Sequence, residues 1–121
     1  QFNTENTFLC DCESYINKKP SAYTIEAVED SHLLAFGNAD LEKLYLTYPV
    51  FEKIGRHITQ AILAYHKEHL NMLLTMSPQQ RYEHISENHP QLLQRVSVTQ
   101  LAQFLGLTRE TVSRLRGKML V

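Results

Sequence analysis

A long run free of helix breakers in the middle of the chain limits the folds open to it. Between Phe51 and Thr75 there is no proline and a single glycine, Gly55. With Pro49 suited to a first helical turn, the spacing of the apolar residues predicts one amphipathic helix of about 25 residues. These residues recur at intervals of three or four over most of the run: Phe51, Ile54, Ile58, Ala61, Ile62, Tyr65, Met72 and Leu73.

A helix of this length favours pairing between two chains, because helices in globular domains average roughly 11–12 residues. We therefore interpret residues 49–76 as a dimerisation helix, although Glu68 and Thr75 would occupy d positions and interrupt a strict heptad repeat. The alternative is one long helix packed within the core of a single domain.

Two Ser-x-x-Gln patterns predict short helices after the long one. Ser77 and Gln80 suit a capping box with a proline in the first turn, and this helix should end before Pro90. Ser97 and Gln100 suit a second capping box, followed by another short amphipathic helix.

Gly106 interrupts that helix, and Thr108 is placed to cap a last one, from Arg109 to about Met119. Two short helices joined by a glycine-containing turn are typical of a helix-turn-helix. Ala102 is small enough for close approach of the helices, and glycine suits the positive φ of a tight turn. The apolar positions of the shared inner face are Leu101, Leu105, Leu107, Val112 and Leu115.

Two helices of an ordinary core are the alternative to a helix-turn-helix, but the joint match of all these positions favours DNA binding. The charge distribution agrees: residues 92–121 carry five basic residues against the single acid Glu110, whereas the whole chain has a net charge of −1. We therefore interpret residues 77–121 as a DNA-binding domain, since a basic segment suits a polyanionic partner.

The polar residues of the last helix should face outward, toward the major groove. Arg109 or Arg114 suits a bidentate contact with guanine, and Glu110 can accept a hydrogen bond from cytosine. The alternative for Glu110 is a favourable position at the positive end of the helix dipole. Contacts with phosphates, which position a protein without specifying sequence, are predicted for Ser97, Thr99, Gln100, Thr108, Thr111, Arg116 and Lys118.

The first 36 residues have the pattern of strands and turns. AYTIEAV alternates bulky and polar residues, the preceding NKKPS suits a turn, and SHLLAF suits a second strand. Strands this few cannot close a core, so we expect the rest of a β domain upstream. The first residue, Gln1 rather than Met, suggests a fragment, a processed product or a chain whose beginning is not included. Asn38 is placed to cap a short helix over ADLEKLYLTY.

Other chemistry is weakly supported by the sequence. Cys10 and Cys12 form a C-x-C pair that could bind metal, but reduced thiols are the simpler interpretation. His66 and His69 could likewise form a metal pair, although solvated or interface histidines are commoner. No nucleophile–base pair, phosphate loop or metal set is apparent, so no enzymatic activity is expected. No signal peptide or membrane span is apparent either, which favours the cytoplasm.

The stretch GLTRETVSRLRGKML resembles the recognition helix of the Crp/Fnr family of bacterial transcription regulators. Residues 23–36 are similar to the last strands of the family's cyclic-nucleotide-binding-type β-roll, and residues 49–75 to its dimerisation helix. Residues 77–116 are similar to its DNA-binding domain, most of all to forms common in Bacteroidetes.

The resemblance implies that Arg109, Glu110, Ser113 and Arg114 face the bases, and that the pattern of the last three reads TTGAT-like half-sites. It implies a homodimer on a pseudo-palindromic site, with RNA polymerase as a further partner. It also implies an effector site at Glu13, Lys19 and Ser21. Family members that bind cyclic AMP have an Arg-Ser pair in the stretch where this chain has Lys19-Pro20-Ser21, and lysine lacks the guanidinium fork.

This departure argues against cyclic nucleotide binding, and one C-x-C pair is too small a cysteine set for an iron–sulfur cluster. No cofactor is therefore predicted.

Together these features predict an α+β fold that is mainly α. Residues 1–48 would be the C-terminal part of a β-roll sensor that lacks its N-terminal part, residues 49–76 the dimerisation helix, and residues 77–121 a winged-helix-like helix-turn-helix domain. The predicted function is effector-controlled, sequence-specific DNA binding. The alternative is a dimeric ligand-binding or protein-interaction module with a vestigial helix-turn-helix.

Overall fold

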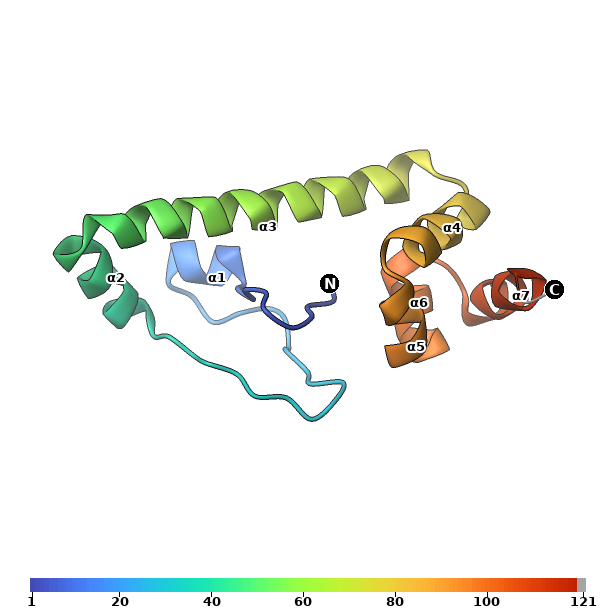
Figure 1. Ribbon diagram of the computed structural model, residues 1–121, viewed down its shortest axis with the longest axis horizontal. Helices are drawn as coiled ribbons and strands as arrows, with labels where there is room; N and C mark the ends of the chain where they lie inside the picture. The colour runs from blue at the N-terminus through green and yellow to red at the C-terminus, as the bar shows by residue number, and fades with distance from the viewer. Residues whose placement is uncertain (120–121) are drawn as a thin grey trace. The chain divides into compact units, whose positions relative to one another are not determined.

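The computed structural model describes residues 1–119, and every regular element in that range is a helix (Figure 1). The chain forms two compact units, residues 2–63 and, in the described part, residues 64–119. The helices are α1 (Cys12–Asn17), α2 (Asn38–Thr47), α3 (Pro49–Thr75), α4 (Pro78–Asn88), α5 (Pro90–Arg95), α6 (Val98–Leu105) and α7 (Arg109–Met119).

The predicted partial β-roll is wrong, because no strand occurs in residues 1–119. The two expected strands are irregular segments whose apolar side chains are exposed, Leu33 and Leu34 by 79% and 81%. Alternation of bulky and polar residues stabilises a strand only where a neighbouring strand and a packed face are present. Neither segment has them here, so the α+β assignment is replaced by an all-helical fold for the described residues.

The first unit also contains a helix that the sequence analysis missed. The Asp11 carboxylate caps α1 by accepting hydrogen bonds from the backbone amides of Glu13 and Ser14, at 3.1 and 3.3 Å. Lys18 ends α1 in the left-handed conformation and pairs with Glu42 of α2 at 3.0 Å.

The start of α2 also differs from the prediction. Gly37 occupies the N-cap position and Asn38 is the first helical residue rather than the cap.

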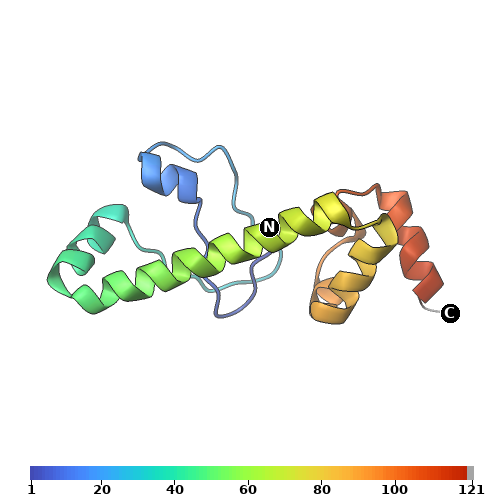
Figure 2. The same cartoon turned by 90° about the horizontal axis from the view of Figure 1, so that it is seen from above.

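The predicted long helix is confirmed as α3, which contains 27 residues. Both views draw α3 as one continuous helix (Figures 1 and 2), and its bounds include Gly55. Glycine disfavours helix interiors, but the Tyr45 side chain lies so close to Gly55 that an added Cβ would be 2.6 Å from the tyrosine hydroxyl. Close packing of Tyr45 therefore accounts for the glycine.

The second unit contains all the buried apolar side chains of the described residues. They come from the end of α3 and from each helix that follows: Met72, Tyr82, Ile85, Leu92, Leu101, Ala102, Phe104, Leu105, Val112 and Leu115. This core joins α4, α5, α6 and α7 into one small helical head.

Local capping explains where the helices of the head begin. The Ser77 hydroxyl accepts a hydrogen bond from the Gln80 amide, while the Gln80 side chain accepts one from the Ser77 amide, at 3.4 and 2.9 Å. The predicted capping box is therefore confirmed. Helix α5 was not predicted, since Pro90 was interpreted as the end of α4 and also begins a new helix.

Candidate nucleic-acid interface

The start of α6 is fixed by the second predicted capping box, which is also confirmed. The Gln100 amide donates to the Ser97 hydroxyl at 3.2 Å, and the Ser97 amide donates to the Gln100 side chain at 3.0 Å. Both side chains were predicted to contact phosphates, and in the structure they hold the first turn of α6. Thr99, the third residue of this group, is exposed.

The turn after α6 has the geometry that its glycine predicts. Gly106 has φ of 63° and ψ of 37°, in the left-handed region. Its amide donates to the Gln103 carbonyl at 3.2 Å, and the Leu107 amide donates to the Ala102 carbonyl at 2.9 Å. These bonds satisfy carbonyls that the end of a helix leaves without partners.

Replacing Gly106 with alanine is expected to lower the free energy of unfolding of the head by about 1–2 kcal/mol, the cost of a left-handed non-glycine residue. The added Cβ would also lie 3.2 Å from Leu73 Cδ2. Chemical denaturation followed by circular dichroism measures this change.

Gly117→Ala in α7 is the matched control. An added Cβ there meets no atom within 4 Å, so the better helix propensity of alanine should stabilise the head by up to about 1 kcal/mol. Equal effects of the two substitutions would contradict the described turn.

The inner face of the motif is buried. Leu101 and Leu105 of α6 are 1% and 0% exposed, and Val112 of α7 is 0% exposed. Ala102 is buried as well, as expected for a small residue that lets the two helices approach. The predicted inner face is confirmed for these positions and for Leu115, while Leu107 is only half-buried.

The N-terminus of α7 is held by Thr108. Its hydroxyl accepts a hydrogen bond from the Thr111 amide at 3.2 Å and lies 3.0 Å from the Thr111 hydroxyl. Thr108 is exposed and Thr111 half-buried. The predicted cap is confirmed, and both hydroxyls lie at the end of α7 that bears Arg109.

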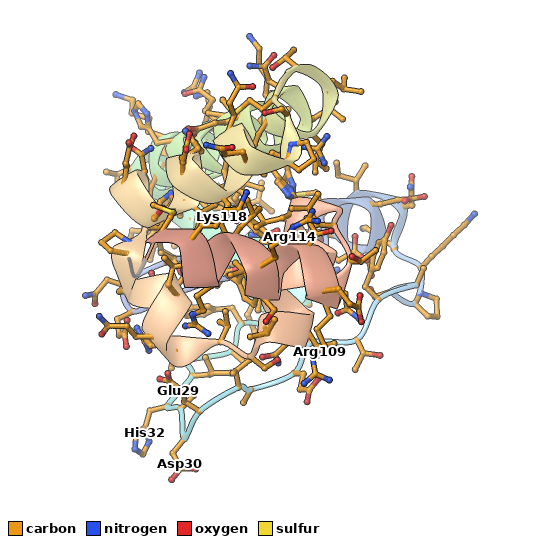
Figure 3. All side chains as sticks on the ribbon, turned by 90° about the vertical axis from the view of Figure 1, so that its right-hand side faces the viewer. Glu29, Asp30, His32, Arg109, Arg114 and Lys118 are labelled. Carbon is orange, nitrogen blue, oxygen red and sulfur yellow. The ribbon has the colours of Figure 1, made fainter. Side chains whose placement is uncertain are left out.

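The outward face of α7 carries the four residues predicted to read bases. Figure 3 looks onto this helix, with Arg109, Arg114 and Lys118 labelled along it. These three cationic side chains are exposed, as are the two other predicted base readers, Glu110 and Ser113. The structure thus places one carboxylate, one hydroxyl and three cations on the accessible surface of a single helix.

Arg116 lies differently from the other basic residues of α7. It is half-buried, and its guanidinium donates a hydrogen bond to the backbone carbonyl of Leu93 in α5. Its predicted phosphate contact stays a prediction, but this bond also gives it a part in fixing α7 to α5.

Two residues that the sequence analysis did not assign to the site bond to the end of α6. The guanidinium of Arg81 donates to the carbonyl of Leu105 at 3.0 Å. The Nε2 atom of His69 lies 2.8 Å from the carbonyl of Phe104, and the two rings stack at 4.3 Å. A carbonyl only accepts, so this nitrogen carries the proton. An arginine near the positive end of α4, where the helix dipole disfavours a cation, was a signal that could have identified Arg81.

The predicted effector residues lie in or next to α1. Glu13 is exposed in its first turn, and Lys19 is exposed after its end. The Ser21 hydroxyl donates to the Asp11 carboxylate at 2.5 Å. This bond, with those from the Ser14 and Glu13 amides, lowers the pKa of Asp11. The carboxylate beside Ser21 makes the position unfavourable for an anion, and the β-roll expected to surround these residues is absent from the described part.

The two cysteines are free thiols in the structure, and both are half-buried. Burial is the main cause that raises the pKa of Cys10, with the nearby Cys12 contributing. Among residues 1–119 no group of three or more His, Cys, Asp or Glu side chains is arranged to hold a metal ion. No helix of that range is both long enough and apolar enough to cross a membrane.

Comparison with known protein families gives a match that falls on this motif. Residues 95–119 match the family model of bacterial regulatory proteins of the crp family. The matched segment begins at the last residue of α5 and contains α6, the turn and α7. No curated protein and no solved structure matches the chain. The α6–turn–α7 segment is therefore similar to the helix-turn-helix of bacterial regulatory proteins of the crp family.

Proposed function

We propose that this protein is a transcription regulator that reads double-stranded DNA with α7 as its recognition helix. The exposed group of Arg109, Glu110, Ser113 and Arg114 carries the proposal. These side chains project from a helix whose opposite face is anchored in the core through Val112, so DNA can meet them on a rigid support.

The chemistry of this face suits base edges in the major groove. The guanidinium of Arg114 can donate two hydrogen bonds to guanine O6 and N7, and the Glu110 carboxylate can accept one from cytosine N4. A carboxylate facing a polyanion is unfavourable unless it has such a donor. A half-site of the TTGAT type follows from the resemblance of this pattern to the Fnr-type variant, and it is the sequence to test first.

Other residues of the motif are placed to bind the DNA backbone. Thr99 and Thr108 are exposed at the starts of α6 and α7, and Lys118 is exposed near the end of α7. Contacts of this kind fix the register of a protein on the duplex. We expect them to supply the salt-dependent part of the affinity.

We further propose that two copies pair through α3 and place two recognition helices on one pseudo-palindromic site. Leu63, Leu70 and Leu74 support this pairing, because they lie 68%, 57% and 75% exposed on a single face of α3. Their spacing of seven and four residues places them within about 40° of one another around the helix. A symmetric dimer would cover this apolar stripe, and RNA polymerase is the further partner that such a regulator would meet on DNA.

Replacing Arg114 with alanine is expected to weaken binding to the matching palindrome by roughly 1–3 kcal/mol and to relax specificity at one base pair. Binding to random DNA should weaken much less. Gel-shift titrations on a TTGAT-type palindrome, its single-base variants and a random duplex, at two salt concentrations, measure both effects.

Lys43→Ala is the matched control, since it removes one exposed positive charge from α2, outside both the dimerisation helix and the helix-turn-helix. It should leave the preference for the palindrome unchanged. Equal losses on specific and random DNA for Arg114→Ala would contradict base reading by this residue. Absence of DNA binding by a wild-type dimer would support the alternative of an interaction module instead.

A further inference from the structure

The carbonyls at the C-terminal end of α6 accept hydrogen bonds both from the turn that follows and from other helices. A helix leaves its last four carbonyls without partners inside the helix. The amides of the turn satisfy two of them, those of Ala102 and Gln103, through Leu107 and Gly106. The remaining two carbonyls, of Phe104 and Leu105, accept from side chains outside the motif.

Those donors come from α3 and α4. His69 of α3 donates to the Phe104 carbonyl at 2.8 Å, and Arg81 of α4 donates to the Leu105 carbonyl at 3.0 Å. Both side chains are half-buried, as expected for groups committed to contacts within the protein. The last turn of α6, directly before the helix-turn-helix turn, is therefore held by side chains from outside the motif.

The same guanidinium of Arg81 also bonds to the end of α3. Its Nη2 donates to the Leu73 carbonyl at 2.8 Å, and its Nε donates to the Met76 carbonyl at 3.0 Å. One planar group thus connects three backbone carbonyls: Leu73 in the last turn of α3, Met76 directly after α3, and Leu105 at the end of α6. Guanidinium provides five donors in a fixed fork, whereas the ammonium of lysine is a single point with three.

Direct packing adds to this connection. An added Cβ on Gly106 would lie 3.2 Å from Leu73 Cδ2 and 3.4 Å from Arg81 Nη1. The turn itself therefore rests on α3 and on the guanidinium. A rotation of the head on α3 would break the Arg81 bond to Leu73, the His69 bond to Phe104 and this contact together.

We propose that Arg81 and His69 are positioning residues that fix the helix-turn-helix on the end of α3, and thereby set the half-site spacing that the dimer selects. The inference rests on the proposed function, because α3 must pair two heads for their spacing to matter. Inserting one base pair between half-sites increases their separation by about 3.4 Å and rotates one relative to the other by roughly 35° about the DNA axis. Only heads held at a fixed angle on α3 can discriminate so small a change.

The test compares DNA duplexes that differ only in the spacer between two half-sites, with one and two base pairs added or removed. Wild-type protein should prefer one spacer to its neighbours by about tenfold or more. Arg81→Lys and His69→Phe should reduce this preference to about threefold or less while changing affinity for an isolated half-site by less than about threefold. His69→Phe keeps the ring stacking on Phe104 and removes only the donor.

Lys43→Arg is the matched control, because it makes the reverse exchange at an exposed residue of α2, outside both the proposed dimer face and the head; it should retain the wild-type spacer preference. An unchanged spacer preference in both Arg81→Lys and His69→Phe would overturn the inference while leaving the proposed function intact. If the wild-type protein does not distinguish the palindrome from random DNA, the proposed function fails and the inference fails with it.

A second measurement on the wild-type protein does not depend on the variants folding. In nitrogen-15 NMR spectra, a guanidinium held by three carbonyls should give separate Nη signals for Arg81, because its rotation is hindered. Averaged Nη signals, as in a freely rotating side chain, would overturn the positioning role of Arg81 even if the variants failed to fold.

Discussion

Replacing Leu105 with alanine should lower the free energy of unfolding of the helical head by about 2–5 kcal/mol. Leu105 is 0% exposed at the end of α6, and its truncation leaves a cavity between α6 and the helices packed on it. Alanine retains the helix and the carbonyl that accepts from Arg81, so the loss isolates side-chain packing. A domain as small as the head has a low free energy of unfolding. The Leu105→Ala protein should therefore lose DNA binding well below the melting temperature of the wild-type protein.

Urea denaturation followed by the amide resonances of α6 and α7 measures this loss without interference from residues 2–63. Leu46→Ala is the matched control, because Leu46 is 86% exposed on α2 and should change stability by less than about 0.5 kcal/mol. Similar small effects of both substitutions would show that the core is not packed around Leu105 as described.

The helices that follow residue 48 could be predicted because their signals are local. A breaker-free run defined α3, two Ser-x-x-Gln patterns defined the starts of α4 and α6, and Gly106 defined the turn. Each signal depends on residues within one or two turns of each other, and capping energies operate at that range. Helix α5 was not predicted because it has only six residues, too few to show a periodic pattern.

The strands predicted in residues 1–36 are wrong because a strand depends on contacts beyond its own segment. Alternation in AYTIEAV is also local, but a strand is stabilised by partners that its own sequence does not contain. The cap that begins α1 was visible as Asp11 followed by an acidic residue in the first turn. It was missed because the whole of residues 1–36 was interpreted as strands and turns.

The candidate site likewise contains residues that the sequence could predict and residues that it could not. The exposure of Arg109, Glu110 and Arg114 follows from helical periodicity once α7 is placed. The contacts of Arg81 with Leu105 and of His69 with Phe104 join residues 24 and 35 positions apart. Such contacts depend on how helices pack in three dimensions, and no spacing rule predicts them.

Replacing Arg81 with methionine should lower the free energy of unfolding of the head by about 2–4 kcal/mol. Methionine keeps most of the apolar stem and its packing, so the loss reports the guanidinium bonds to Leu73, Met76 and Leu105. Hydrogen bonds from charged donors contribute about 1.5–3 kcal/mol each, but water can reach this half-buried site and replace part of that. Arg81→Lys should lie between wild type and Arg81→Met, because one ammonium cannot reach three carbonyls together.

The matched control for this prediction is Arg109→Met, which makes the same chemical change at an exposed position of α7. It should alter stability by no more than about 0.5 kcal/mol while weakening DNA binding. Arg81→Met should change the denaturation midpoint more than it changes DNA binding. A stability loss that is equal for Arg81→Met and Arg109→Met would mean that Arg81 does not join α6 to α3. The distinction matters because both arginines lie in the same small head, and only their bonding partners separate a residue that supports the recognition helix from one that reads DNA.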